Sequence, residues 1–325
     1  MNVGSGRRAV AIGGGTGLPG VLRCLVDLGF ETTAVVTMAD DGGSSGMLRR
    51  QLGMLPPGDV RNCIAALAED DEALLTRLFQ YRFPHGEGLA GHALGNLILA
   101  ALADITGSFP AAISAVEGYL HTRGHVLPST LADIQLHGVD RAGATLSGQA
   151  RLADNPEPLS RVRLEPAKPP AFPPALEAIR AADVIVIGPG SLFTSLIPIL
   201  LVSGFAEAVR ASRATRIYVC NVANMRGETS GLDAADHVAA LAEHGLEGAI
   251  DVVLVHEAIV DQRTARPASA CDDCLAVEPV SADAGVRDRI AARGPRVVSA
   301  DLADPADPVR HSRVALCRAL ERVVS

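Results

Sequence analysis

Tryptophan is absent from this sequence, and aromatic residues make up only 3% of its 325 residues. Alanine, valine, leucine and isoleucine must therefore supply the core. With 48% hydrophobic residues, the chain has enough apolar side chains for one large domain or two modest ones.

Lysine is almost absent too, since Lys168 is the only one. The formal net charge is −8, from 29 basic and 37 acidic residues, and this excess of acid argues against a general nucleic-acid-binding surface. A small anionic ligand is not excluded, because nearby arginines and backbone N–H groups decide its binding. Any cationic clamp on a phosphate must use arginine.

Long apolar runs are missing as well. The nearest candidate for a membrane span, residues 184–202, is interrupted by Gly188, Pro189 and Gly190, and residues 1–8 lack the apolar core of a signal peptide. We therefore predict no membrane span and a cytoplasmic location.

Six cysteines are present. Four of them stand singly in apolar surroundings, which favours small, buried and unpaired side chains: Cys24, Cys63, Cys220 and Cys317. The pair in Cys271-Asp-Asp-Cys274 lacks a second Cys or His pair, so we interpret it as a loop rather than a zinc or redox site.

The first motif is a glycine-rich turn between an apolar strand at residues 9–12 and an apolar helical pattern from residue 21. A strand, turn and helix in this order aim backbone N–H groups and the positive end of a helix at one point, which attracts phosphate. Glycine is needed because a Cβ would block close approach and disfavour positive φ. The candidate ligand-binding residues are Gly13, Gly14, Gly15, Thr16, Gly17 and Leu18.

A second polar loop follows the β-branched strand predicted at residues 32–38. It is either a solvated loop with Ser44 or Ser45 capping the next helix, or a ligand site at the carboxyl end of a parallel strand. We favour the ligand site, because open α/β sheets bind ligands there and paired carboxylates could hold a ribose hydroxyl, a base or a metal. The candidates are Asp40, Asp41, Gly42 and Gly43.

Two helix starts add further candidates. Pro-Pro-Gly at residues 56–58 gives a rigid helix entry, so Asp59, Arg61 and Asn62 fall in the first turn, as an anion and hydroxyl clamp or as ordinary surface residues. His92 and Asn96 are four residues apart at the start of an apolar helix, which places both on one face. A packed or capping histidine is the commoner case, but a polar pair on an apolar helix favours a pocket.

The first pattern recurs in the second half of the chain, where a near-continuous apolar strand at residues 182–187 runs into a glycine turn and an apolar helix. The candidates are Gly188, Pro189, Gly190, Ser191, Leu192 and Thr194, and the hydroxyls of Ser191, Thr194 and Ser195 are expected to be available to a phosphate. Asn221 follows a later strand at residues 215–220. Arg310 and His311 are predicted in the first turn of a closing helix at residues 308–323.

Strands alternate with helices, so we predict an α/β fold with a mostly parallel, Rossmann-like sheet and helices on both faces. Residues 125–165 contain short strands joined by turns and are predicted to form a small β-rich insertion. The insertion divides one domain into an N-terminal part, residues 1–124, and a C-terminal part, residues 166–325. The strand-end loops predict one cavity, surrounded by Gly14, Gly15, Thr16, Asp40, Asn96, Gly190 and Ser191.

Taken together, these motifs resemble the YvcK-type gluconeogenesis-factor family of the CofD-like superfamily. The matching stretches follow the family's order over nearly the whole chain: residues 12–18, 39–46, 56–63, 79–83, 91–96, 188–195 and 221–229. The family's C-terminal arginine is matched by Arg310. Its tyrosine ligand contact is not matched, because that region is Cys271-Asp-Asp-Cys274 here.

The resemblance implies a CofD-like fold and a cytoplasmic protein that binds UDP-N-acetylglucosamine (UDP-GlcNAc). It implies a regulatory role that links gluconeogenic carbon supply to cell-wall precursor synthesis and cell shape, without catalysis and without a required cofactor. A homo-oligomer and a regulatory protein partner in amino-sugar synthesis are expected.

Two other functions compete with this one. Relatives of the CofD type are transferases that join a phospholactyl group to a deazaflavin, and in that case Asp40 and Asp41 would hold Mg²⁺. A nicotinamide dehydrogenase is the third, since residues 15–20 match G-x-G-x-x-G and Asp40 lies at the expected interval. Pro19 inside the would-be phosphate turn and the lack of an evident hydride-transfer acid argue against it.

Overall fold

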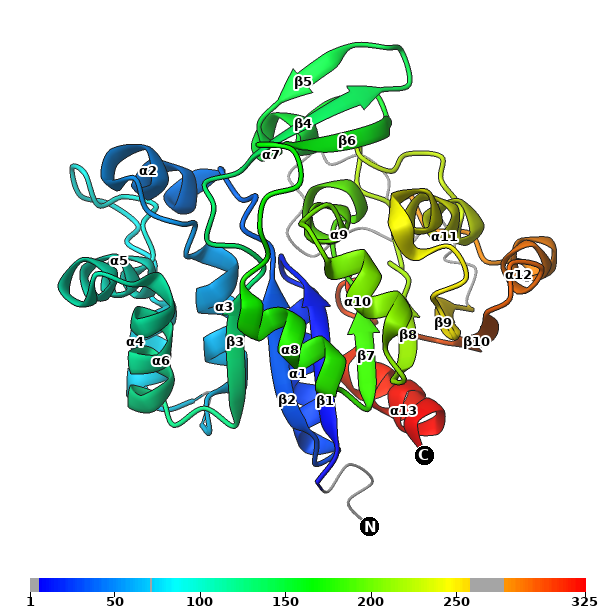
Figure 1. Cartoon of the computed structure of the whole chain (residues 1–325), viewed down its shortest axis with the longest axis horizontal. Coiled ribbons are helices and arrows are strands. Elements are labelled where there is room, and N and C mark those ends of the chain that lie inside the picture. The colour runs from blue at the N-terminus through cyan, green and yellow to red at the C-terminus, as the bar shows by residue number, and fades with distance from the viewer. Residues whose placement is uncertain (1–5, 71, 258–277) are drawn as a thin grey trace.

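The structure, a computed structural model, describes residues 6–70, 72–257 and 278–325. Its frame is a sheet of seven parallel strands in the order β10-β9-β8-β7-β1-β2-β3, as Figure 1 shows, which confirms the predicted parallel sheet. The strands are β1 Arg8–Gly13, β2 Glu31–Val36, β3 Gly124–Pro128, β7 Val184–Ile187, β8 Thr215–Val219, β9 Val252–His256 and β10 Arg296–Ala300.

Helices cover both faces of this sheet. In Figure 1, α8 and α10 pass in front of the strands, and α1 and α13 pack against each other behind them. The helices of the first half are α1 Leu18–Asp27, α2 Gly43–Leu52, α3 Gly58–Leu67, α4 Leu74–Gln80, α5 Leu94–Thr106, α6 Phe109–Tyr119 and α7 Gln149–Ala153. Those of the second half are α8 Pro173–Ala181, η1 Leu192–Leu196, α9 Ile197–Leu200, α10 Phe205–Ala211, α11 Ala234–Leu241, η2 Ala242–Leu246, α12 Ala284–Ala291 and α13 Arg313–Val324. Among the described helices, none is long and apolar enough to cross a membrane.

The position of β1 in the sheet explains its apolar sequence. β1 lies between β2 and β7, with Ala9 paired to Thr32 on one side and to Val184 on the other. Helices cover both of its faces, so its apolar residues are all buried, which is why the sequence runs apolar without alternation.

The strand order reverses between β1 and β7. The chain proceeds from β1 through β2 to β3 on one side, and from β7 to β10 on the other. The loops that follow β1 and β7 therefore diverge and leave a crevice at the carboxyl ends of the strands, which is where open α/β sheets bind ligands. Both glycine-rich turns are these loops.

A small antiparallel sheet lies beyond those strand ends and is drawn in green at the top of Figure 1. It consists of β4 Gln135–Asp140, β5 Thr145–Ser147 and β6 Leu159–Glu165, in the order β5-β4-β6. The predicted insertion therefore needs a correction at its start, because β3 pairs with β2 in the large sheet. A strand pattern gives the strand but not the sheet that it joins.

Two further expectations differ from the structure. Cys24 and Cys317 are not separate buried thiols, because a disulfide joins them across α1 and α13, whereas Cys63 and Cys220 are free and buried. Arg310 and His311 precede α13, which begins at Arg313 after the Ser312 cap. Residues 271–274, where the family's tyrosine is missing, lie outside the described residues.

Candidate ligand-binding site

The two glycine-rich turns touch each other at the carboxyl edge of the sheet. A Cβ added to Gly17 would lie 2.8 Å from the carbonyl oxygen of Pro189, and one added to Gly190 would lie 3.1 Å from that of Gly14. Gly15 has φ of +68°, a conformation that side chains with a Cβ disfavour. The structure thus brings the turns after β1 and β7 to one place.

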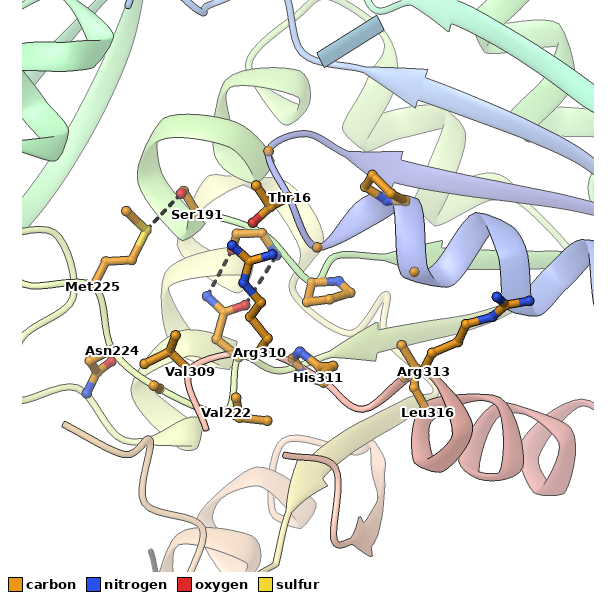
Figure 2. A pocket seen from close by; sticks show the side chains of 18 of the residues that line it. Thr16, Ser191, Val222, Asn224, Met225, Val309, Arg310, His311, Arg313 and Leu316 are labelled. Atoms are coloured by element: carbon orange, nitrogen blue, oxygen red, sulfur yellow. Dashed lines mark hydrogen bonds between the residues drawn. The ribbon is translucent and has the colours of Figure 1, made fainter. Parts of the chain in front are cut away.

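A cavity of about 450 Å³ opens beside these turns, within the size range of small-molecule sites. Four segments line it, as Figure 2 shows: the first turn with α1, the second turn, residues 221–225 and residues 309–316. The lining residues that the sequence had indicated are Gly15, Thr16, Gly17, Pro189, Gly190, Ser191, Asn221, Arg310 and His311.

The wall of this cavity is positively charged. Arg23, Arg310 and Arg313 line it, and none of the described lining residues is acidic. Figure 2 shows the Arg310 side chain reaching into the pocket toward Thr16. We call this hollow the arginine-lined cavity. In a chain of net charge −8, such a wall attracts a small anion.

The start of α1 adds to this potential. Gly17 caps the helix without a side-chain hydrogen bond, and no acidic residue occupies the first turn. The helix N-terminus therefore keeps its partial positive charge at the cavity wall. The ion pairs Arg310–Asp307 at 3.0 Å and Arg313–Asp27 at 2.6 Å are exposed and neutralise these arginines only weakly.

The floor of the cavity is fixed by hydrogen bonds. The Asn221 side chain accepts from Gly190 N at 3.2 Å and donates to Gly190 O at 2.9 Å. His311 Nε2 lies 3.0 Å from the carbonyl oxygen of Cys220, which can only accept, so Nε2 carries the proton. Burial lowers the pKa of His311 to about 4, so the ring is neutral at pH 7 and Nδ1 is an acceptor.

Two of the three second-turn hydroxyls that were predicted to be available to a phosphate have partners within the protein. Ser191 Oγ donates to Met225 Sδ at 2.9 Å, and Thr194 Oγ1 donates to Glu228 Oε2 at 3.1 Å. The N–H groups of Phe193 and Thr194 donate to Glu228 Oε1 at 2.7 and 3.2 Å. Three donors of the second turn, Phe193 N, Thr194 N and Thr194 Oγ1, therefore already have a partner within the protein.

A separate polar group lies on the β2 side of the first turn. In it, Ser44 Oγ and His92 Nδ1 are hydrogen-bonded at 2.9 Å, Asn96 Nδ2 donates to Ser44 Oγ at 2.9 Å, and Arg61 Nη1 donates to Asn96 Oδ1 at 3.3 Å. We call it the buried polar cluster; its members are Asp40, Ser44, Ser45, Asp59, Arg61, His92 and Asn96.

Burial sets the charge state of this cluster. It raises the pKa of Asp59 to about 6, with the neighbouring Asp40 carboxylate adding to the shift. It also raises the pKa of Asp40 and lowers that of Arg61 to about 10. Paired carboxyls have raised pKa values where burial disfavours their ionised form, and such pairs occur at many functional sites.

The first turn separates the cluster from the cavity. A Cβ on Gly14 would lie 2.5 Å from Asp59 Oδ2, and the Gly15 N–H donates to Asp59. Asp40 and Asn96 are not among the residues that line the arginine-lined cavity. The single cavity predicted from the sequence is thus two polar regions on opposite sides of one turn.

The carboxylates of Asp40 and Asp41 point to different partners. Asp40 Oδ1 accepts from Gly42 N at 3.0 Å, whereas Asp41 accepts from Gln149 N at 2.9 Å and Ala150 N at 2.8 Å, at the start of α7. Asp41 therefore fastens the small sheet's helix to the large sheet. Among the described residues, no group of three or more His, Cys, Asp or Glu side chains could hold a metal ion.

The remaining candidates have structural positions. Asn62 Oδ1 accepts from Arg61 Nη2 at 2.6 Å, Gly42 caps α2 and Gly43 begins it, and Leu18 and Leu192 are buried at helix starts. Gly13 and Gly188 lie against Leu196.

Sequence reasoning missed two of the three arginines in the cavity wall. Arg23 is one helical turn beyond Pro19 and Gly20, so the 3.6-residue period of α1 placed it on the cavity side. Arg313 lies three residues after Arg310, at the start of α13. Both spacings can be seen in the sequence, but they indicate a site only when the bounds of α1 and α13 are known.

The protein is thus a doubly wound α/β protein with an arginine-lined cavity at the switch point of its sheet, which is where open α/β sheets bind ligands. A family model described as 2-phospho-L-lactate transferase CofD matches residues 9–303. The chain belongs to this CofD family, and it resembles the members that are named gluconeogenesis factors.

Three relatives show the degree of similarity. A Nostoc protein is 52% identical over 253 residues, which are 78% of this chain and 55% of the Nostoc chain, so this chain spans about half of that relative. The Bacillus subtilis gluconeogenesis factor is 46% identical over 254 residues, 78% of this chain and 80% of its own. A crystal structure of a UPF0052-family protein from Bacillus halodurans superposes with a TM-score of 0.87 at 41% identity, covering 97% of this chain and 99% of that one.

Proposed function

We propose that this protein is a non-catalytic, cytoplasmic regulatory protein that binds a nucleotide sugar, UDP-GlcNAc, and links gluconeogenic carbon supply to cell-wall precursor synthesis and cell shape. The observation that carries the proposal is the arginine-lined cavity. It combines three arginines, the free N-terminus of α1 and no acidic side chain among the described lining residues. This is the environment that a diphosphate requires.

The other walls suit the rest of such a ligand. Val222, Ala223, Met225 and Val309 give the cavity an apolar side, and Asn221, Asn224 and the neutral His311 line it with polar groups. A nucleotide sugar has both an apolar base face and hydroxyl groups. The names of the relatives support the regulatory part of the proposal, since the Bacillus subtilis protein is called a gluconeogenesis factor.

A thermal-shift panel tests the ligand. A ligand that binds only the native state raises the melting temperature by an amount set by RT ln(1 + [L]/Kd). UDP-GlcNAc should raise it at micromolar to millimolar concentration, and NAD, GDP and a deazaflavin should raise it less. A larger shift with NAD or the deazaflavin would reject the nucleotide-sugar proposal.

The alternative function is a Mg²⁺-dependent transferase of a phosphorus-containing group. One observation favours it: Asp40 and Asp59 lie together behind the first turn with raised pKa values, as acids around a catalytic metal would in its absence. The family model, described as a transferase, points the same way.

Chelation separates the two functions. A regulatory binder should keep its UDP-GlcNAc affinity in excess EDTA and should return the ligand intact after long incubation, as followed by chromatography. Loss of binding with EDTA, or steady release of a cleaved product, would favour the transferase. Asp40→Asn should then abolish Mg²⁺ binding and turnover together, whereas for a regulatory binder it should alter affinity modestly.

We also propose self-association and a regulatory protein partner in amino-sugar synthesis. The outer helix α4 leaves Leu74, Leu75 and Leu78 exposed by 70%, 49% and 42%, more apolar surface than one helix of a monomer usually shows. Light scattering should give a mass above the 33.6 kDa of one chain. If wild type has the mass of a monomer, and Leu74→Lys has the same mass, self-association through α4 is contradicted.

A further inference from the structure

Glu228 is a fully buried carboxylate that the proposed function does not use. It lies in the segment after β8, and it does not line the arginine-lined cavity. Its two oxygens accept three hydrogen bonds, from Phe193 N, Thr194 N and Thr194 Oγ1. These donors are the N–H groups of the second and third residues of η1 and the first hydroxyl within it.

This arrangement is the one that a phosphate would adopt at a helix N-terminus. Backbone N–H groups and a hydroxyl converge on a negative group where the helix dipole favours it. The second glycine turn has the same strand–turn–helix plan as the first, but the chain supplies its own anion. The two turns differ at their helix starts. The Gly15 N–H before α1 donates to Asp59, but the first turn of α1 has no acidic residue, whereas two N–H groups of η1 donate to Glu228.

The same segment also holds the rest of the second turn. Asn221 is hydrogen-bonded to Gly190, and Met225 accepts from Ser191. With Glu228, three residues of this segment therefore bind the second turn. On its other side, Glu228 O accepts from Leu159 N at 3.2 Å, and a Cβ on Gly227 would collide with Asn155 O. Residues 221–228 thus connect the cavity to the small sheet.

We infer that Glu228 is an internal anion that occupies the second turn in place of a ligand phosphate, and that it thereby positions the 221–225 wall and directs ligand phosphates to the first turn. Glu228 is a positioning residue, since it does not line the arginine-lined cavity. The inference about ligand phosphates rests on the proposed function. The inference that the Glu228 carboxylate fills the anion position of the second turn does not depend on that function.

Chemical rescue tests the occupied anion place without any nucleotide. Glu228→Ala removes the carboxylate and should lower the melting temperature. Formate or acetate should restore part of the lost melting temperature, because the small anion can bind Phe193 N and Thr194 N in place of the carboxylate. The reference is chloride at equal ionic strength. The matched control is Glu207→Ala, whose carboxylate is 68% exposed and pairs only weakly with Arg210 at 3.9 Å.

The expected pattern is specific rescue of Glu228→Ala, with neither wild type nor Glu207→Ala gaining as much from the carboxylate. Equal response of all three proteins would overturn the inference. Should Glu228→Ala fail to fold, Glu228→Gln keeps an acceptor oxygen for both N–H groups and lacks the charge. That variant should fold, and inclusion of formate during refolding should raise the soluble yield of Glu228→Ala but not of Glu228→Gln.

The positioning role is tested by calorimetry with UDP-GlcNAc. Glu228→Ala should lose about tenfold or more in affinity, and formate should recover it. Glu228→Gln keeps the acceptor oxygen and lacks the charge, so its affinity should fall between those of Glu228→Ala and wild type. Wild-type affinity in Glu228→Gln would mean that the hydrogen bonds, and not the charge, position residues 221–225. A loss that formate does not recover would mean that the side chain is merely structural. If wild type does not bind UDP-GlcNAc, the proposed function fails, and the formate experiment still decides on the internal anion.

Discussion

Gly15 is the residue on which the anion site most depends. It has φ of +68°, and a Cβ there would meet no protein atom within 4 Å, so a side chain would point into the space kept for the ligand. Gly15→Val should therefore reduce nucleotide-sugar affinity by at least about tenfold, or about 1.4 kcal/mol, while the fold survives. Isothermal calorimetry and circular dichroism measure the two effects.

The chain provides a matched control for this change. Gly53 ends α2 with φ of +65° and also has no atom within 4 Å of an added Cβ. Gly53→Val should show the same backbone cost in unfolding experiments and normal affinity. Equal affinity of both variants would mean that the first turn is only structural.

Asp59 gives the protein a pH-dependent stability. Burial raises the pKa of Asp59 from 3.8 to about 6, so the folded protein holds this proton more tightly than the unfolded chain does. Its contribution to the free energy of unfolding is therefore greatest near pH 4 and falls as pH rises through 6, by about 3 kcal/mol in all.

Asp59→Asn should reduce this slope, because the amide does not titrate and its oxygen can still accept from Gly15 N; the slope that remains is expected from other carboxyls with raised pKa values, such as Asp40. Urea unfolding at several pH values measures it, with the exposed Asp104→Asn as the control for a lost charge. A slope between pH 4 and 6 that is as steep in Asp59→Asn as in wild type would assign the titration to another group.

At the scale of elements, the segment before α13 carries the cation that reaches furthest into the cavity. Asp304 N donates to Arg310 O at 2.8 Å and Arg310 N donates to Asp307 O at 2.9 Å, so a closed turn holds Arg310 in place. Arg310→Ala should weaken anion binding by about tenfold at low salt and by less at high salt, because added ions screen the lost charge. Arg322→Ala, on the last turn of α13, removes the same charge away from the cavity and should leave affinity unchanged in the same titrations.

Asp41 connects two elements, the loop after β2 and the start of α7. It accepts from two N–H groups at the start of α7, so Asp41→Ala should destabilise the protein by about 1–2 kcal/mol. Hydrogen exchange should accelerate in residues 145–153, while ligand affinity stays within about twofold, with or without EDTA. Loss of affinity together with a new Mg²⁺ requirement in wild type would return Asp41 to the role of a metal ligand.

The elements also show how far sequence reasoning reaches. The strand, turn and helix at residues 8–27 were predictable because glycine, proline and apolar spacing act locally. The shape of the second turn was equally predictable. Its contacts were not, since Glu228, more than thirty residues later, accepts from Phe193 N, Thr194 N and Thr194 Oγ1. No sequence pattern singled out β10. The strand β3 was predicted as a strand, but the sheet that it joins was not.

The candidate site was harder to predict than the fold for the same reason. Local patterns found Thr16, Ser191 and Arg310, but the division between cavity and buried cluster depends on contacts across the first turn, such as Gly14 against Asp59. Such contacts follow from tertiary packing, which no spacing within one segment encodes.

At the scale of the whole molecule, Cys24 and Cys317 join α1 to α13 across 293 residues of sequence. A crosslink over so long a loop restricts the unfolded chain, and native disulfides typically contribute about 2–4 kcal/mol. Reductant should lower the urea midpoint of wild type and leave that of Cys24→Ser unchanged. The same midpoint in both proteins with and without reductant would show that the pair is not bonded in solution. Cys63→Ser serves as the control for loss of a buried thiol.

The cavity draws its walls from parts of the chain that a ribosome makes far apart in time. At about 5–20 residues per second, the first turn emerges well before β7, and Arg310 follows later still. A growing chain can pair β1 with β2 early, but it presents the first turn without the arginine opposite. A nucleotide sugar in the cell would thus find its full site only on molecules whose two ends have already come together. Occupancy would therefore report on finished, folded copies and not on nascent ones.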